Sequence, residues 1–291
     1  MNIEHVKTMT PLQRFLYWVT ERHNIYLKRL AGRPKPWTDD VILQTEFFTN
    51  PFREFDKTTV WLRENVRLPL TNRPEVLMAT VIFRWFNLIS TGELLLKHDL
   101  FVKWDSKKAT EILLDYWDDG NNPVFTNAYI IKAGNGPRGC KIPNVCKAIG
   151  AVWEEQDRLV TLCLESRSMQ TVWKALKKFY GIGGFNGYEL VCDFRWTYLL
   201  KDATDKDTWC NVGPGAKRGM NWILEKDLDI LIPSDVWCTK TKELLDKLKG
   251  LKLKNAPVPE MREVEHSLCE YDKYSRVLFG TGRSKRSYDG W

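Results

Sequence analysis

The sequence has few of the residue patterns that hold metals or disulfides. Its seven cysteines are scattered, and no two of them form a C-x-x-C pair. Its four histidines, at positions 5, 23, 98 and 266, are equally dispersed. Because zinc, iron–sulfur and disulfide frameworks need ligands at characteristic spacings, we expect no dedicated metal centre. We instead expect the cysteines to serve as small apolar residues in a reducing cytoplasm.

Long apolar runs are also lacking. The first twenty residues do not join a basic region to an apolar one, so we expect no signal peptide. No apolar run approaches the roughly 20 residues that span a bilayer, so we expect no membrane partner. Internal repeats and low-complexity tracts are lacking as well.

What the sequence does contain indicates a well-packed helical protein. Of its 291 residues, 43% are apolar and thirteen are tryptophan, which is ample for a large core. Apolar residues recur at helical spacing over several long segments, among them 9–30, 106–118 and 261–274. The pattern predicts a mainly α fold, either as one domain over residues 1–291 or as two lobes, one of them at about 145–222. A basic tail follows at 276–291. The net charge of +7 only weakly favours a polyanionic partner.

Residues 168–222 carry the most informative patterns. Apolar residues predict one helix up to about Tyr180 and a second from Tyr188, and the glycines between them break the helix. Such a helix-hairpin-helix unit would grip a DNA phosphate through backbone N–H groups and nearby cations. Five residues are candidates for this contact: Gly181, Gly183, Gly184, Lys177 and Lys178. On the second helix, Glu189 and Asp193 are four residues apart and share a face.

A second glycine-rich stretch, GPGAKRG at 213–219, predicts a rigid turn that carries two cations. Exposed N–H groups beside Lys217 and Arg218 would make an anion site, with Gly213 and Gly215 as its backbone donors. The stretch at 134–141 contains G-x-G-x-x-G. Because Ile142-Pro143 follows, we expect a loop there rather than a dinucleotide-binding helix, and the stretch also fails as a phosphate loop of a nucleotide kinase.

Two further groups of polar residues interrupt apolar segments. Asn50, Arg53 and Asp56 recur at three-residue spacing and would line one stripe, which is either a solvated face or part of a site. Arg84 interrupts a helix that is apolar on most sides, and a buried arginine requires a partner.

Six stretches taken together resemble a known family. They are ERHNIYLKR (21–29), PWTDD-ILQT-FFTNPFREFDKTTVWLREN (36–65), FTNAYIIKAG (125–134), FYGIGGFNGYELVCDFR (179–195), GPGAKRGMN (213–221) and EVEHSLCEYDKYSRV-FGTGR (263–283). Nearly the whole chain resembles the alpha-glutamyl/putrescinyl thymine pyrophosphorylases, the amino acid:DNA transferases of bacteriophages. The same helical domain accompanies 5-hydroxymethyluracil DNA kinases. Both are regarded as distant relatives of DNA glycosylases, so the resemblance implies a DNA-glycosylase-like helical fold in the host cytoplasm.

The resemblance implies thymine hypermodification in double-stranded phage DNA. A kinase pyrophosphorylates 5-hydroxymethyldeoxyuridine, and the transferase then displaces the pyrophosphate with an amino acid or a polyamine. We expect the target base to be flipped into a pocket. The leaving pyrophosphate would be held by Lys217, Arg218, Gly213 and Gly215, and it could carry a bound Mg²⁺ ion. The kinase is a possible protein partner.

Three carboxylates are candidates for the base that accepts the amine proton: Asp193, Glu189 and Asp207. Asp193 is preferred because the glycine turn precedes its helix, although Glu189 and Asp193 could equally pair with nearby arginines. The resemblance adds pocket candidates, which are Asn50, Arg53, Asp56, Arg84, Tyr129 and Glu270. Two other functions stay open, a glycosylase that excises a modified pyrimidine and a non-catalytic DNA-binding partner of the kinase.

Overall fold

The computed structural model describes residues 3–128, 130–131 and 138–282, with the side chains of 138–140 left out. The described residues form helices and loops and no strand, which confirms the predicted mainly α class. The chain divides into two compact units. Unit 1 combines residues 1–56 with 207–291, and unit 2 holds residues 57–206. The predicted lobe at about 145–222 therefore lies mostly in unit 2, and of the basic tail the structure describes residues 276–282.

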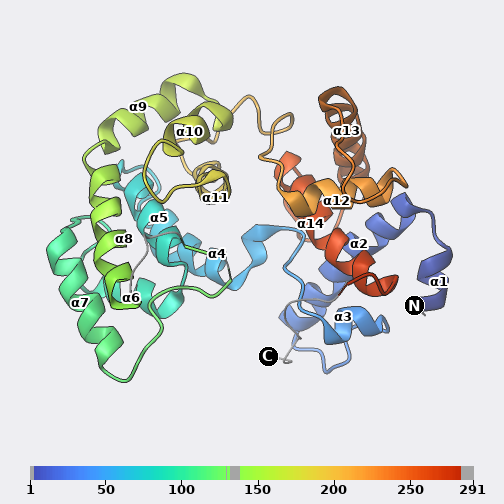
Figure 1. Ribbon diagram of the computed structural model, residues 1–291, viewed down its shortest axis with the longest axis horizontal. Helices are drawn as coiled ribbons and strands as arrows, with labels where there is room; N and C mark the ends of the chain where they lie inside the picture. Colours follow the sequence, from blue (N-terminus) through green and yellow to red (C-terminus); the bar gives the residue numbers. More distant parts are fainter. Residues whose placement is uncertain (1–2, 129, 132–137, 283–291) are drawn as a thin grey trace. The chain divides into compact units, whose positions relative to one another are not determined.

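Unit 2 is built around α5 (Glu75–Phe86), whose residues from Val76 to Phe86 are all buried. Helices α8, α9 and α11 pack on α5 (Figure 1). A helix that is apolar on nearly every side can be stable only when other helices surround it. The other elements of the unit are α4 (Lys57–Leu62), η2 (Arg63–Arg67), α6 (Ile89–Lys97), α7 (Ser106–Asp118), α8 (Arg138–Trp153), α9 (Gln156–Ser166), α10 (Met169–Leu176) and α11 (Gly184–Phe194).

Unit 1 is built around α14 (Met261–Leu278), which packs against α12, α13, α2 and α3. Thus the two ends of the described chain form one core. Val264, Leu268 and Tyr271 of α14 are fully buried in it. The other elements are α1 (Ile3–Thr8), α2 (Pro11–Leu30), α3 (Val41–Thr45), η1 (Arg53–Phe55), α12 (Pro214–Ile223) and α13 (Ser234–Gly250).

The prediction of a glycine turn at 213–219 is wrong. Pro214 begins α12, so Gly215 and Gly219 lie within a helix. A Cβ atom on Gly219 would stand 2.1 Å from the backbone oxygen of Leu268, and one on Gly215 would stand 2.5 Å from Sγ of Cys269. The missing side chains therefore let α12 approach the backbone of α14 closely.

The prediction of a loop at 134–141 is also wrong for the described part of that stretch. α8 begins at Arg138 and includes Pro143. Because Pro143 is the sixth residue of the helix, its missing N–H removes a single hydrogen bond near the start. The glycines at 134 and 136 lie outside the described residues. No described helix is both long and apolar enough to cross a membrane.

Candidate functional site

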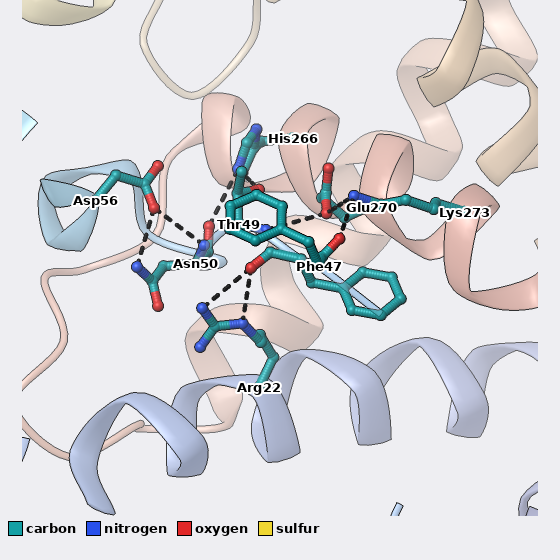
Figure 2. Close-up of polar contacts among 9 residues, drawn as sticks. Arg22, Phe47, Thr49, Asn50, Asp56, His266, Glu270 and Lys273 are labelled. Atoms are coloured by element: carbon teal, nitrogen blue, oxygen red, sulfur yellow. Dashed lines mark hydrogen bonds and ion pairs between the residues drawn. The ribbon is translucent and has the colours of Figure 1, made fainter. Parts of the chain in front are cut away.

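Unit 1 contains a group of polar side chains that we call the polar cluster (Figure 2). Its members come from α2, from the segment between α3 and α4, and from α14. They are Arg22, Thr49, Asn50, Asp56, His266, Glu270 and Lys273.

The α14 side of the cluster is a helix face. His266, Glu270 and Lys273 are four and three residues apart, so they project from the same side of α14. Glu270 and Lys273 form an ion pair of 2.7 Å in which both side chains are largely buried. Lys273 Nζ also donates to the carbonyl of Phe47, at 2.8 Å, and the backbone N–H of Thr49 donates to Glu270 Oε2, at 3.1 Å. These bonds hold the segment at 47–49 against α14.

His266 approaches the same segment with one ring nitrogen. Its Nε2 lies 2.9 Å from the hydroxyl of Thr49 and 3.1 Å from the carbonyl oxygen of Asn50. Burial lowers the pKa of His266 well below its ordinary value, and the charges of Arg262 and Arg53 lower it further. The imidazole is therefore neutral at neutral pH. A hydrogen on Nε2 suits both oxygen neighbours, so Nδ1 carries the lone pair.

Asp56 is fixed through one of its two carboxylate oxygens. Oδ1 accepts from the backbone N–H of Asn50, at 3.1 Å, and from its side-chain Nδ2, at 2.9 Å. The other oxygen points away from these bonds in Figure 2, and within the described residues no hydrogen bond reaches it. Burial raises the pKa of Asp56, while the bonds from Asn50 and the charges of Arg53 and Arg22 oppose this. The result is an oriented carboxylate that accepts a proton more readily than an exposed aspartate.

The structure therefore brings together Asn50, Asp56 and Glu270, which the sequence predicts as pocket residues, although not as one helical stripe. Helix α3 ends at Thr45, and Pro51 follows Asn50, so only Arg53–Phe55 form a short helical turn. The chain curves back instead, and Asn50 contacts Asp56 directly. Arg53 is buried and close enough for its charge to act on both Asp56 and His266. Tyr129 lies outside the described residues.

Beside the polar cluster, unit 1 has a pocket of about 390 Å³ that we call the Trp37 pocket. It lies between α2, the loop that leads to α3, and α3 itself. Arg22 and Phe48 line it, and they also connect it to the polar cluster, because Arg22 Nε and Nη2 both donate to the carbonyl of Phe48. The other lining residues are Ile25, Arg29, Lys35, Pro36, Trp37, Thr38, Leu43, Gln44 and Glu46.

In unit 2, Asp193 is paired with arginines. Arg84 donates to both of its carboxylate oxygens, at 2.6 and 2.9 Å, and Arg67 lies 3.8 Å from Oδ1. The side chains of all three residues are at most 3% exposed. The buried Arg84 thus has the partner that its position requires. A catalytic role for Asp193 stays a prediction, and it would require the carboxylate to leave this ion pair.

The other predicted bases lie in different surroundings. Glu189 is almost buried on α11 and lines a small space of about 10 Å³ together with Arg84 and Ile182. That space accommodates about one water molecule. Asp207 belongs to unit 1, where its Oδ1 lies 3.4 Å from Nζ of Lys249, and about a third of its side chain is exposed. Asp205, the aspartate before it, caps α10 by accepting from the backbone N–H groups of Met169 and Gln170.

The predicted phosphate-gripping turn lies between α10 and α11. Gly181 has a φ of +83°, the left-handed geometry that glycine adopts without strain. Lys177 Nζ lies 3.8 Å from the centre of the Trp173 ring, and Trp173 Nε1 donates to the carbonyl of Gly184, which joins the two helices. The side chains of Lys177 and Lys178 are exposed, and nothing lies within 4 Å of a Cβ atom built on Gly183.

The predicted pyrophosphate ligands Lys217 and Arg218 lie on α12. Arg218 is paired with the buried Asp272, to which its Nε and Nη2 atoms approach within 3.0 Å, and Arg276 approaches the same carboxylate at 3.3 Å. Lys217 is exposed. Their role in binding pyrophosphate stays a prediction. Among the described residues, no group of three or more histidine, cysteine or acidic side chains is placed to hold a metal ion.

The sequence interpretation missed His266, Lys273 and Thr49. The signal for the first two was available, because residues 266, 270 and 273 share one face of a helix that the pattern predicts. Thr49 carried no such signal, since its contacts join residues more than 200 positions apart.

Comparisons with known proteins cover most of the chain. A family model described as "5-hmdU DNA kinase, helical domain" matches residues 10–284. A 5-hmdU DNA kinase of Bacillus phage SP10 is 28% identical over an alignment that covers 93% of this chain and 45% of the kinase. The chain thus spans less than half the length of this relative. No solved structure matches. The match is to the kinase helical domain, and the narrower transferase family stays a prediction.

Proposed function

Because the chain belongs to the family of 5-hmdU DNA kinase helical domains, we propose that it takes part in phage thymine hypermodification as an amine:DNA transferase. Its substrate is DNA that carries 5-pyrophosphoryloxymethyl-deoxyuridine, and its second substrate is a small amine such as glycine or putrescine. The amine nitrogen forms a bond to the 5-methylene carbon. The bond from that carbon to pyrophosphate breaks, its electron pair leaves on the pyrophosphate oxygen, and the amine proton passes to a carboxylate.

The observation that supports this proposal is the environment of Asp56. A general base works best when its pKa approaches the working pH and its acceptor atom faces the proton. Asp56 has two features that favour this role, since burial raises its pKa above the ordinary aspartate value and Asn50 orients its carboxylate. We assign the proton transfer to Asp56, with Asn50 as a positioning residue. Glu189 and Asp207 stay as alternative bases, while Asp193 is already paired with Arg84.

The test is incubation with DNA that contains the pyrophosphorylated base and a panel of amines, followed by mass spectrometry of the nucleosides. We expect an amine adduct and one released pyrophosphate for each adduct. Abasic sites would instead indicate a glycosylase. If no amine in the panel gives an adduct or releases pyrophosphate, the transferase proposal is wrong.

Three matched variants test the assignment of the base. Asp56→Asn keeps an oxygen that can accept from Asn50 but removes the basic group, so we expect amine transfer to fall about 100-fold or more. Glu189→Gln and Asp207→Asn make the same chemical change elsewhere and should stay within a few-fold of wild type. A large loss in either of these, with Asp56→Asn fully active, would transfer the role of base to that residue.

The comparisons also support a second function, that of a non-catalytic DNA-binding partner of a kinase. The supporting observation is that the matched relative is a DNA kinase and that the matching model describes its helical domain. This alternative predicts that the chain binds hydroxymethyluracil DNA and raises the rate at which a 5-hmdU DNA kinase phosphorylates it. It also predicts no adduct in the assay above.

A further inference from the structure

The Trp37 pocket has the charge of a site for an anion. Three of its lining side chains, Arg22, Arg29 and Lys35, are cations, and Glu46 is the one carboxylate among the described residues that line it. When most charges that line a concave surface have the same sign, the electrostatic potential inside it is stronger, because the walls exclude water.

The pocket also offers a flat ring to its ligand. The indole of Trp37 is half-buried, and its Nε1 donates to the carbonyl of Arg33, at 2.7 Å, which fixes the plane of the ring. The guanidinium carbon of Arg29 and Nζ of Lys35 lie 5.4 and 5.3 Å from the ring centre. Two cations thus lie over the tryptophan ring. This combination suits a ligand that has both an aromatic ring and phosphate oxygens, because indole rings stack on bases and guanidinium groups bind phosphate.

Size and position agree with this ligand. A pocket of about 390 Å³ falls within the range of roughly 300–1,000 Å³ typical of small-molecule sites. Arg22 lines the pocket, donates to the carbonyl beside Thr49, and lies close enough to Asp56 for its charge to lower the pKa of that carboxyl. A ligand whose phosphates bind Arg22 would therefore lie next to the proposed base.

We propose that the Trp37 pocket receives the flipped target base, with the pyrimidine stacked on Trp37 and the pyrophosphate bound by Arg22, Arg29 and Lys35. This inference rests on the proposed function and specifies where its DNA substrate reacts. As the bond to the methylene carbon breaks, negative charge grows on the pyrophosphate oxygen that leaves. The three cations stabilise that charge, and Asp56 accepts the proton from the incoming amine.

Binding is tested by calorimetry, without any reaction, on the full chain. The probes are the free nucleoside 5-pyrophosphoryloxymethyl-deoxyuridine, inorganic pyrophosphate and thymidine. We expect the pyrophosphorylated nucleoside to bind more tightly than either fragment. Arg29→Ala with Lys35→Ala should weaken its binding roughly tenfold or more. Trp37→Leu should weaken the nucleoside roughly tenfold and leave pyrophosphate unchanged.

The matched control is Lys107→Ala with Lys108→Ala, which removes the same charge from exposed positions on α7. Arg29 and Lys35 are not core residues, and thermal unfolding of each variant checks that the fold is kept. If the pocket variants bind the nucleoside as wild type does, or if the α7 control loses as much affinity as they do, the pocket assignment is wrong.

The two proposals fail separately. Suppose that wild type transfers an amine to DNA while the pocket variants bind and react normally; the pocket is then wrong and the transferase function stands. Suppose instead that the pocket variants lose nucleoside binding but wild type gives no adduct with any amine. The pocket then stands as a nucleotide site, and the transferase function is wrong.

Discussion

Arg84 donates to both carboxylate oxygens of Asp193, and the two side chains are almost completely buried. Arg84 also donates to Thr59 Oγ1 and to Asn87 Oδ1. The ion pair therefore connects α11 to α5 and α4 within unit 2. A charge buried in this way is stable only while its partner is present.

We predict that Asp193→Ala destabilises the protein by about 3–5 kcal/mol, because it leaves the buried Arg84 without its carboxylate. Urea unfolding measures this loss. Asp202→Ala, an exposed aspartate of the same unit, should change stability by no more than about 0.5 kcal/mol. A loss below about 1 kcal/mol for Asp193→Ala would show that the pair is not a structural anchor.

Gly219→Ala tests the close packing of α12 on α14. A Cβ atom at this position would stand 2.1 Å from the backbone oxygen of Leu268, and backbone cannot rotate away as a side chain can. We expect a loss of about 1–3 kcal/mol or more in the free energy of unfolding. Gly250→Ala is the control, because nothing lies within 4 Å of its Cβ position, and it should stabilise by about 0.4–1 kcal/mol. If Gly219→Ala is neutral, glycine is not required for the approach of the two helices.

Glu265 predicts a pH dependence of stability. Burial raises its pKa from the ordinary 4.5 to about 7, opposed by Arg262 and by the N–H of Gly213. Between these pH values the folded protein keeps a proton that the unfolded chain has released. The contribution of Glu265 to the free energy of unfolding should therefore be largest below about pH 4.5 and fall as the pH rises towards 7.

Glu265→Gln should make that fall shallower, measured as urea midpoints at several pH values. Part of the fall should remain, because burial also raises the pKa of Glu263 to about 7. Glu243→Gln, on the exposed side of α13, should leave the pH profile unchanged. A Glu265→Gln profile identical to that of wild type would show that Glu265 does not titrate in this range.

The turn between α10 and α11 is predicted to contact the DNA backbone. Lys177→Ala with Lys178→Ala should weaken binding of unmodified duplex DNA equally for different sequences and reduce its salt dependence, because fewer counterions are released. Fluorescence anisotropy at several salt concentrations measures both effects. The double variant of Lys107 and Lys108 removes the same charge, so an equal loss of affinity there would indicate a non-specific effect of net charge.

Most of the helices could be predicted from the sequence because their apolar residues repeat at helical spacing. The segments predicted at 106–118 and 9–30 are examples. Helix α7 has the predicted bounds, and α2 begins two residues later than predicted, at Pro11. The glycine pair at 215 and 219 misled, because glycine serves equally well in a turn and at a close helix crossing. The positions of Leu268 and Cys269 on α14 distinguish the two uses.

The site was predictable only in part for a related reason. The sequence alone determined that the chain is mainly helical and that its charged residues interrupt particular apolar faces, since these properties belong to local patterns. Its resemblance to a known family, and not a local pattern, added Asn50, Asp56 and Glu270 as pocket candidates. Only the tertiary structure showed that Arg84 forms an ion pair with Asp193 and that Thr49 is hydrogen-bonded to His266 and Glu270. Those contacts join residues 109 to 221 positions apart. Local spacing carries no information about such distances, because the packing of whole helices sets them.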